Sequence, residues 1–345
     1  MLSSLLLCSL LCPGLGPQNG DQDPVLPRVT DDSEKAPLGA EGKQLERGKI
    51  PAGTSDLARQ RFERLSSSTW TGEKAPARLR SFMVTFDARV RATSSGSNDL
   101  RTTFLYLEEG RGYVRGIFPK SRRESVRGPE GDWLLDGEEL LDLSDHSNLE
   151  SRREHQRWLA LARNFAILAS PGNLRLGRLQ AAQVEGQGQE LKIGEGLPIQ
   201  FPSSGHAKRA RQLEWLQLTT PDFDLLASKG SRTALRQVRL GLDPKDGRVR
   251  FALVEPMDAK APLTSAPILV EIPSWITINQ RLLPKQLLVH RRPAAENPQD
   301  PGLSKPYPAR LAFEKLPGVD LFLVMGQTKM DVNLSAADFA QPGPR

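Results

Sequence analysis

The chain has almost no cysteine. Of its 345 residues only Cys8 and Cys12 carry thiols, and both lie close to the amino terminus. The rest of the chain therefore has neither a disulfide framework nor a cysteine-ligated metal site. We expect its stability to come from secondary structure and an apolar core.

Long apolar segments are also missing. After the run from Met1 to Cys12, which stops at Pro13-Gly14, none approaches the roughly 20 apolar residues that a membrane-spanning helix needs. The short run is typical of an export signal over residues 1–16, cleaved near Gly16, so we expect a protein of the periplasm or cell envelope. A second interpretation is that Cys12 is the lipid-attachment residue of a bacterial lipoprotein. Both interpretations stay open.

Residues 17–53 contain no aromatic side chain and are rich in Pro, Gly and charged residues. Such a composition cannot bury enough surface to order itself, and it predicts a disordered tether. Residues 54–345 have enough apolar residues for a core and are expected to form one β-rich domain.

Charge is abundant but not clustered. Lys and Arg total 47 against 41 Asp and Glu, a formal net charge of +6, and the two signs alternate along most of the chain. This distribution argues against nucleic acid as a partner. A weakly basic surface would still be attracted to an anionic membrane surface.

Apolar periodicity predicts the fold class. In residues 80–91, Phe82, Val84 and Phe86 alternate with polar residues, as in a half-buried strand. Similar runs separated by turn residues, among them residues 213–219 and 310–315, predict about eleven antiparallel strands. Two helices are expected, one beginning near Asp56 with Leu57 on its apolar stripe, and one carrying a stripe of Trp158, Phe165 and Leu168. A sheet of this length twists and coils, so we expect a mainly β fold with a few helices: a curved antiparallel sheet forming a half-open barrel with the helices on its concave face.

Catalytic and cofactor motifs are absent from the sequence. The four histidines are far apart in the chain, so no metal and no cofactor is predicted; His155 is expected to be solvated. Ser203 and His206 stand in a Pro/Gly-rich segment that predicts a turn. Asp136 and Glu138 could form an acid/base pair, but a hydrated turn explains them more simply.

Several segments together resemble the lipoprotein-carrier superfamily of LolA, LolB and their relatives. In that family a strand ending in Arg-Pro-Gly-x-x-Arg precedes a strand that leads to an Asp-Gly turn. The positions that match are Pro119, Arg122 or Arg123, Asp136 and Gly137, whereas Phe118 stands where the family has arginine. The resemblance implies an incomplete barrel over an apolar cavity that reversibly binds acyl chains.

Three functions follow as hypotheses. The preferred one is a non-enzymatic envelope protein that binds lipid or lipoprotein acyl chains. Its expected cavity residues are Phe82, Val84, Phe86, Trp158, Phe165 and Leu168. The second is an envelope sensor or scaffolding module that binds a protein partner. The third is an envelope-polymer hydrolase that would depend on Asp136, Glu138 or His206. An open apolar cavity would favour carriage, and a cavity filled by side chains would favour the interaction module.

Overall fold

The computed structural model describes residues 45–72, 79–91, 97–108, 112–143, 149–195, 198–224, 235–256, 268–290 and 319–341. The expected export signal, Cys12, most of the tether and a strand expected near residues 310–315 lie outside these residues. In the described part, a 13-stranded sheet has the order β6-β5-β4-β3-β2-β1-β16-β15-β14-β13-β12-β11-β7. Its strands are β1 Ser81–Arg91, β2 Ser97–Leu107, β3 Tyr113–Phe118, β4 Arg123–Gly128, β5 Gly131–Asp136, β6 Glu139–Leu141, β7 Arg178–Ala182, β11 Glu214–Thr220, β12 Arg236–Leu242, β13 Val249–Pro256, β14 Ile268–Ile278, β15 Arg281–His290 and β16 Val319–Met330.

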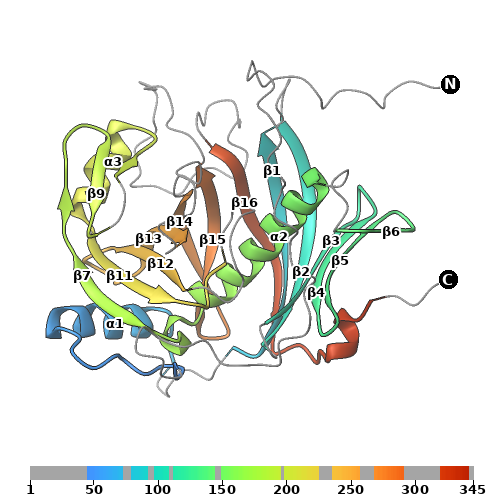
Figure 1. The fold of residues 1–345 in the computed structure, drawn as a ribbon, viewed down its shortest axis with the longest axis horizontal. Helices are drawn as coiled ribbons and strands as arrows, with labels where there is room; N and C mark the ends of the chain where they lie inside the picture. Colours follow the sequence, from blue (N-terminus) through green and yellow to red (C-terminus); the bar gives the residue numbers. More distant parts are fainter. Residues whose placement is uncertain are drawn as a thin grey trace, which may run out of the picture.

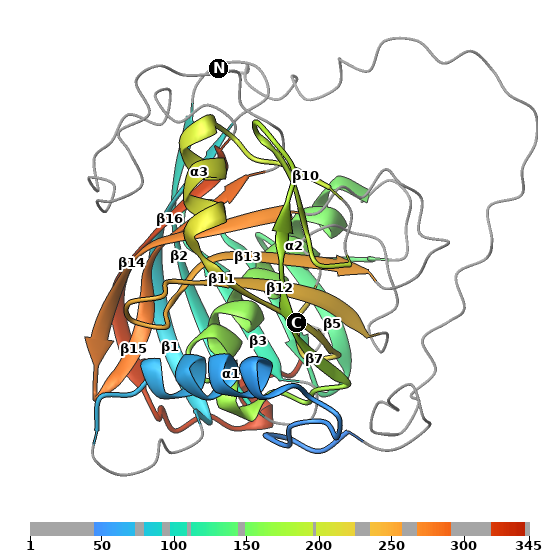
Figure 2. The same cartoon turned by 90° about the vertical axis from the view of Figure 1, so that its left-hand side faces the viewer.

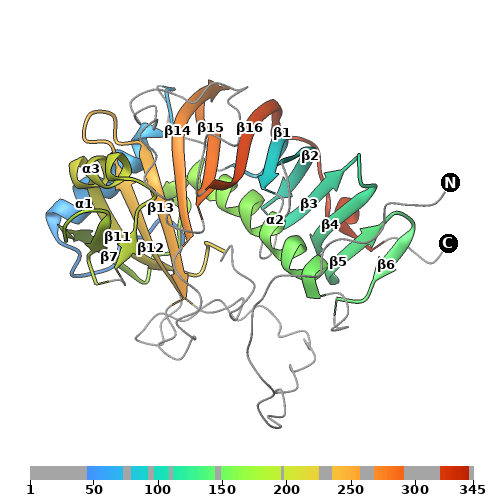
Figure 3. The same cartoon turned by 90° about the horizontal axis from the view of Figure 1, so that it is seen from above.

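The sheet is antiparallel and curved, and it does not close on itself. Consecutive hairpins build β1 to β6, and the last strand, β16, pairs with β1, where Phe82 lies opposite Met330. Seen from above, the strands form a crescent whose two ends, β6 and β7, stay apart (Figure 3). The half-open antiparallel architecture expected from the sequence is therefore confirmed.

The long helix α2 (Leu149–Leu168) lies in the concavity of this crescent (Figures 1 and 3). Helix α1 (Asp56–Ser68) begins at the N-cap Ser55 and packs at one end of the sheet, near β7 and β11 (Figure 2). Its buried face holds Ala58, Phe62 and Leu65, whereas Leu57, expected on that stripe, is 49% exposed. The described helices include none that is long and apolar enough to span a membrane.

A smaller unit, here called the cap, covers part of the convex face. It consists of a three-stranded sheet of β8 (Val184–Glu185), β9 (Glu190–Ile193) and β10 (Ile199–Gln200), together with helix α3 (Ser204–Gln212). Helix α3 lies outside the crescent, on the side away from α2 (Figure 3). It is a third helix where the sequence predicted a turn, because the side chain of Ser203 accepts a hydrogen bond from the N–H of His206 and caps the helix.

Two cores therefore sandwich the sheet between β11 and β16. On β11, Leu216 and Leu218 join the core beneath α2, while Trp215 points into the core beneath the cap. Every residue of β11 from Trp215 to Thr220 is buried, including the polar Gln217 and Thr219, so the simple alternation expected for residues 213–219 does not describe this strand.

Residues 45–53, assigned by composition to the tether, lie against the domain. The N–H of Gly48 donates to the carbonyl of Leu174 at 3.0 Å, and Ile50 packs against the main core. This stretch is stabilised by contacts with the segment after α2, which local composition does not reveal.

Candidate functional site

The residues expected to line a ligand cavity come together on the concave face, but they contact one another. The ring of Phe165 on α2 lies 5.5 Å from that of Phe82 and 5.3 Å from that of Phe86, both on β1. The ring of Trp158, about two turns earlier on α2, lies 5.2 Å from that of Phe118. Val84 and Leu168 are buried in the same core. The inner face of α2 therefore fills the concavity at this level with aromatic packing.

A small cavity lies beside α2 in the described part of the chain. Its volume is about 40 Å³, and it lies between α2, β2 and the 3-10 helix η2 (Pro171–Asn173), lined in part by Arg47, Tyr106, Arg163 and Asp222. Ligand pockets usually enclose about 300–1,000 Å³, so this cavity has room for water and none for an acyl chain. Burial, together with the charge of Glu108, raises the pKa of the Tyr106 phenol to about 12.

A polar contact, here called the Asp224 clasp, links α2 to β4. The carboxylate of Asp224 accepts hydrogen bonds from Arg163 on α2 and from Arg127 on β4, both at 2.6 Å. Asn164 on α2 bonds to the backbone N–H and carbonyl of Asp224 at 2.8 and 2.9 Å. Burial alone would raise the pKa of Asp224, but the two guanidinium groups outweigh it and hold that pKa below its ordinary value.

The positions that match the carrier motif lie around the turns that flank β4. Pro119 and Arg122 are exposed in the β3–β4 turn, and Arg122 has a φ of 51°. Arg123 on β4 pairs with Asp136 at 2.6 Å and with Glu154 on α2 at 2.9 Å. Gly137 takes a φ of 68° in the turn after β5, a conformation that favours glycine. The carboxylate of Asp136 thus forms an ion pair with an arginine. Acid/base catalysis would instead need it to act together with Glu138.

His155, expected to be solvated, is buried on α2 with its Nε2 3.8 Å from a carboxylate oxygen of Asp132. The sequence-based expectation was wrong because the charged neighbours of His155 suggested an exposed helix face. In the structure α2 is enclosed between the sheet and other segments, and residues 158–166 are all buried.

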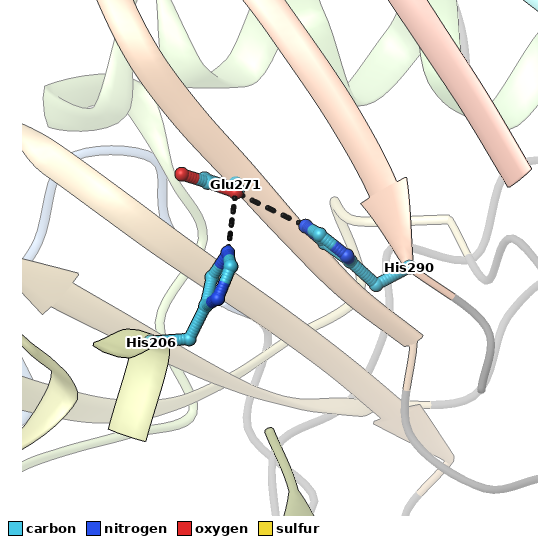
Figure 4. A group of neighbouring side chains, drawn as sticks. All are labelled: His206, Glu271 and His290. Atoms are coloured by element: carbon cyan, nitrogen blue, oxygen red, sulfur yellow. Dashed lines mark hydrogen bonds and ion pairs between the residues drawn. The ribbon is translucent and has the colours of Figure 1, made fainter. Parts of the chain in front are cut away.

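Beneath the cap, three side chains that the sequence keeps apart meet in one cluster. His206 comes from α3, Glu271 from β14 and His290 from β15 (Figure 4). The same carboxylate oxygen of Glu271, Oε2, lies 3.2 Å from Nε2 of His206 and 3.1 Å from Nε2 of His290. The three residues are only 3–5% exposed. Because 84 positions separate the histidines, only the pairing of β14 with β15 and the docking of α3 bring them together.

The cluster has a definite protonation pattern. Burial would raise the pKa of Glu271, but hydrogen bonds from both histidines, and their charges when protonated, lower it to about 2. An ionised Glu271 accepts from Nε2–H of each ring. Nδ1 of His206 lies 2.7 Å from the hydroxyl oxygen of Ser203, so this nitrogen accepts the hydroxyl proton when Nε2 carries the ring proton.

Two chemistries fit these residue types. Two imidazoles and a carboxylate are ligands for a divalent transition metal. Ser203, His206 and Glu271 also form a chain of hydrogen bonds like that of a hydrolase triad. However, the hydroxyl of Ser203 is buried and already caps α3. Among the described residues it is therefore not accessible to a substrate carbonyl. The metal-binding chemistry is therefore the better match.

A buried ion pair lies under the same cap. Arg239 on β12 pairs with Glu255 on β13, and its Nη1 donates to the carbonyl of Ile193 on β9 at 3.2 Å. Sequence reasoning missed both residues, because in a strand buried on both faces charged residues look like ordinary surface positions. The cap is thus held by polar contacts as well as by its apolar core.

No protein-family model matches the sequence, and no curated protein matches it. The chain is similar to several solved structures. They include a DUF1329 family protein from Desulfovibrio piger, with 10% identity over 83% of this chain and 98% of its own and a TM-score of 0.43. A second is described as an outer membrane lipoprotein-sorting protein domain from Vibrio parahaemolyticus, with 10% identity, coverage of 82% and 97% and a TM-score of 0.41.

A third is the LolA superfamily protein NE2245 from Nitrosomonas europaea, with 13% identity, coverage of 82% and 97% and a TM-score of 0.40. At these identities and TM-scores the likeness assigns the chain to no family and transfers no ligand, partner or site residue.

Proposed function

We propose that this chain is a non-enzymatic binding protein of the cell envelope that takes up acyl chains of a lipid or lipoprotein on its concave sheet face when α2 moves aside. The observation that supports this is that one helix fills an otherwise apolar concavity. Trp158, Phe165 and Leu168 on α2 take the place that apolar chains would occupy against Phe82 and Phe86.

The free energies limit which ligands can displace α2. Its large buried apolar residues are Trp158, Leu159, Leu161, Phe165 and Leu168. Exposing them costs roughly 1.5–3 kcal/mol each, or about 8–15 kcal/mol in total. Breaking the buried Asp224 clasp adds about 3–5 kcal/mol. An acyl chain of about 15 methylenes gains about 12 kcal/mol on leaving water, at about 0.8 kcal/mol per methylene.

One acyl chain therefore about matches the smallest cost of moving α2, whereas two chains, with about 24 kcal/mol, exceed the whole range. The ligand class that fits this proposal is a diacyl or triacyl lipid group, and a single fatty acid should bind poorly. The interior of the sheet would replace water around the chains, and no covalent step is needed.

A second candidate function is an envelope sensor or scaffolding module that binds a protein partner and carries no lipid. The observation that favours it is the filling of the concavity: aromatic rings from α2 and β1 are in contact, and the cavity beside α2 holds about 40 Å³. In this function α2 is a permanent part of the core.

A reversible lock on α2 separates the two functions. Arg123 on β4 and Glu154 on α2 form an accessible ion pair, so R123C and E154C can be joined by a reducible bismaleimide in a C8S/C12S background. The matched control joins D87C to R101C, an exposed pair within β1 and β2 that leaves α2 unlinked. Binding of a fluorescent diacyl phospholipid and of a fluorescent fatty acid is measured before and after reduction.

Carriage predicts that the α2 lock abolishes diacyl binding, that reduction restores it, and that the control cross-link has no effect. Equal binding by the locked protein would refute displacement of α2. If neither probe binds in any state, carriage is wrong. The interaction module would then be tested by isolating the protein from envelope extracts and measuring a stoichiometric partner whose retention does not change with the lock.

A further inference from the structure

The cluster of His206, Glu271 and His290 lies under the cap, on the face of the sheet opposite to α2. It therefore has no part in the proposed binding of acyl chains. Leu269 and Leu288, on the strands that carry the cluster, belong to the apolar core around it, and the ring of Phe251 lies 6.2 Å from that of His206. A polar cluster in such surroundings needs a reason, because burying polar groups is costly unless they are fully satisfied.

Three residues of types that bind transition metals offer their donor atoms at one place. One ligand atom from each of His206, Glu271 and His290 lies within 4.8 Å of the other two. Nε2 of each histidine is 3.1–3.2 Å from Oε2 of Glu271. An ion about 2.0–2.1 Å from each of these donors would see nitrogen–metal–oxygen angles of about 100°, close to the tetrahedral value.

The neighbouring groups support the ligand roles. When Nε2 of His206 binds a metal, its proton moves to Nδ1, which then donates to the hydroxyl of Ser203 at 2.7 Å. A hydrogen bond of this kind on the distal nitrogen orients a metal-binding histidine and makes it a better donor. Glu271 supplies one negative charge, and a hydroxide as fourth ligand would balance the second charge of the ion.

We propose that His206, Glu271 and His290 bind a divalent transition-metal ion, preferentially Zn²⁺, with a water or hydroxide as the fourth ligand. The ion connects α3 to β14 and β15 and so fastens the cap to the main sheet. The ion stabilises this part of the molecule, which has no cysteine, by cross-linking segments that are far apart in the chain, as a disulfide would. Histidine spacing in the sequence predicted no metal, because it cannot register the pairing of distant strands.

The test uses the full chain, purified after growth with and without added zinc. Elemental analysis gives the zinc content, and thermal unfolding of chelator-treated protein is followed with and without Zn²⁺. The variants are H206Q, E271Q and H290Q. The matched control is H155Q, which changes a histidine that is also buried but lies on α2, away from the cluster.

We expect about one zinc per wild-type and H155Q chain, and an increase in melting temperature with Zn²⁺ for both. The three cluster variants should lose the bound zinc and the increase. Wild-type protein without stoichiometric zinc after growth in zinc, or H206Q and H290Q chains that retain it, would overturn the proposal.

Two further measurements do not depend on the folding of the ligand variants. S203A keeps all three ligands and should bind Zn²⁺ about 10–100-fold more weakly, since it removes the partner of His206 Nδ1 together with the N-cap of α3. Wild-type protein loaded with Co²⁺ should show the intense visible bands of a four-coordinate site. Unchanged affinity in S203A together with a weak six-coordinate Co²⁺ spectrum would contradict the proposed site.

Discussion

Replacing Asp224 by asparagine is expected to loosen α2 without changing the apolar packing beneath it. Asp224 receives charged hydrogen bonds from Arg127 on β4 and Arg163 on α2, both at 2.6 Å, and its side chain is 14% exposed. Asparagine keeps the size of the side chain, and the backbone of residue 224 can keep its two bonds to Asn164. The change therefore removes mainly the charge that balances two guanidinium groups.

The loss should be large for a single atom replacement. Breaking a buried ion pair by removing one partner costs about 3–5 kcal/mol, since the other charge stays buried without compensation. We expect D224N to lower the free energy of unfolding in urea by about that amount. The matched control is D87N, which breaks an ion pair with Arg101 whose side chains are more than 60% exposed; such surface pairs contribute about 0–1 kcal/mol.

The same variant tests the proposed movement of α2. If acyl binding requires displaced α2, the apparent dissociation constant equals the intrinsic one divided by the population of that state. A loss of about 3 kcal/mol in the closed state corresponds to roughly a hundredfold gain in affinity for a diacyl probe, at 1.4 kcal/mol per factor of ten. D87N should leave the affinity unchanged.

The acidic side of the stability curve gives an independent check. The pKa of Asp224 is lower in the folded protein than its ordinary 3.8, so its contribution is complete above that value and is lost as the pH falls through the folded pKa. The difference between wild type and D224N should therefore shrink in acid. A loss of less than 1 kcal/mol at neutral pH, or a difference that does not depend on pH down to 2, would refute the role given to the clasp.

Three further changes test other parts of the structure. F165A removes a ring that contacts Phe82 and Phe86 and should cost about 3–5 kcal/mol in urea unfolding; a loss below 1 kcal/mol would mean that α2 is not packed as described. G128A would place a Cβ against the backbone carbonyl of Phe339, so the melting temperature should fall by several degrees, whereas G131S, in open space but at positive φ, reports backbone strain alone. E271Q removes a carboxylate whose pKa is about 2, so the stability that wild type loses between pH 4.5 and 2 should be smaller in the variant; an unchanged acid limb would contradict the ionised state of Glu271.

Much of the fold was predictable because β-strand periodicity is local. The alternation of Phe82, Val84 and Phe86 is enough to place β1 with one face in the core, and the turn residues between strands predict antiparallel hairpins. Helix α2 was predictable for the same reason, since Trp158, Phe165 and Leu168 recur at helical spacing. The half-open shape follows from the twist of a long antiparallel sheet that has helices to cover its inner face.

The cap was not predictable in this way. Its helix α3 is short and begins in a Pro/Gly-rich stretch, where a capping serine and a turn look alike. The strands beneath it are buried on both faces, which hides the second core and leaves Arg239 and Glu255 without a periodic signal. His155 was misread because the burial of its face of α2 depends on what packs over it.

The sequence by itself determined the class of this protein. Strand and helix periods depend on neighbouring residues, and the scarcity of cysteine and the absence of catalytic motifs follow from composition and short patterns. Only the tertiary structure decided what the concave face contains and which histidines meet. Whether Phe165 lines a void or fills it depends on how closely α2 approaches β1, and His206 reaches His290 only through the docking of α3 on β14 and β15. Both are distances between segments far apart in the chain, and no local pattern encodes them.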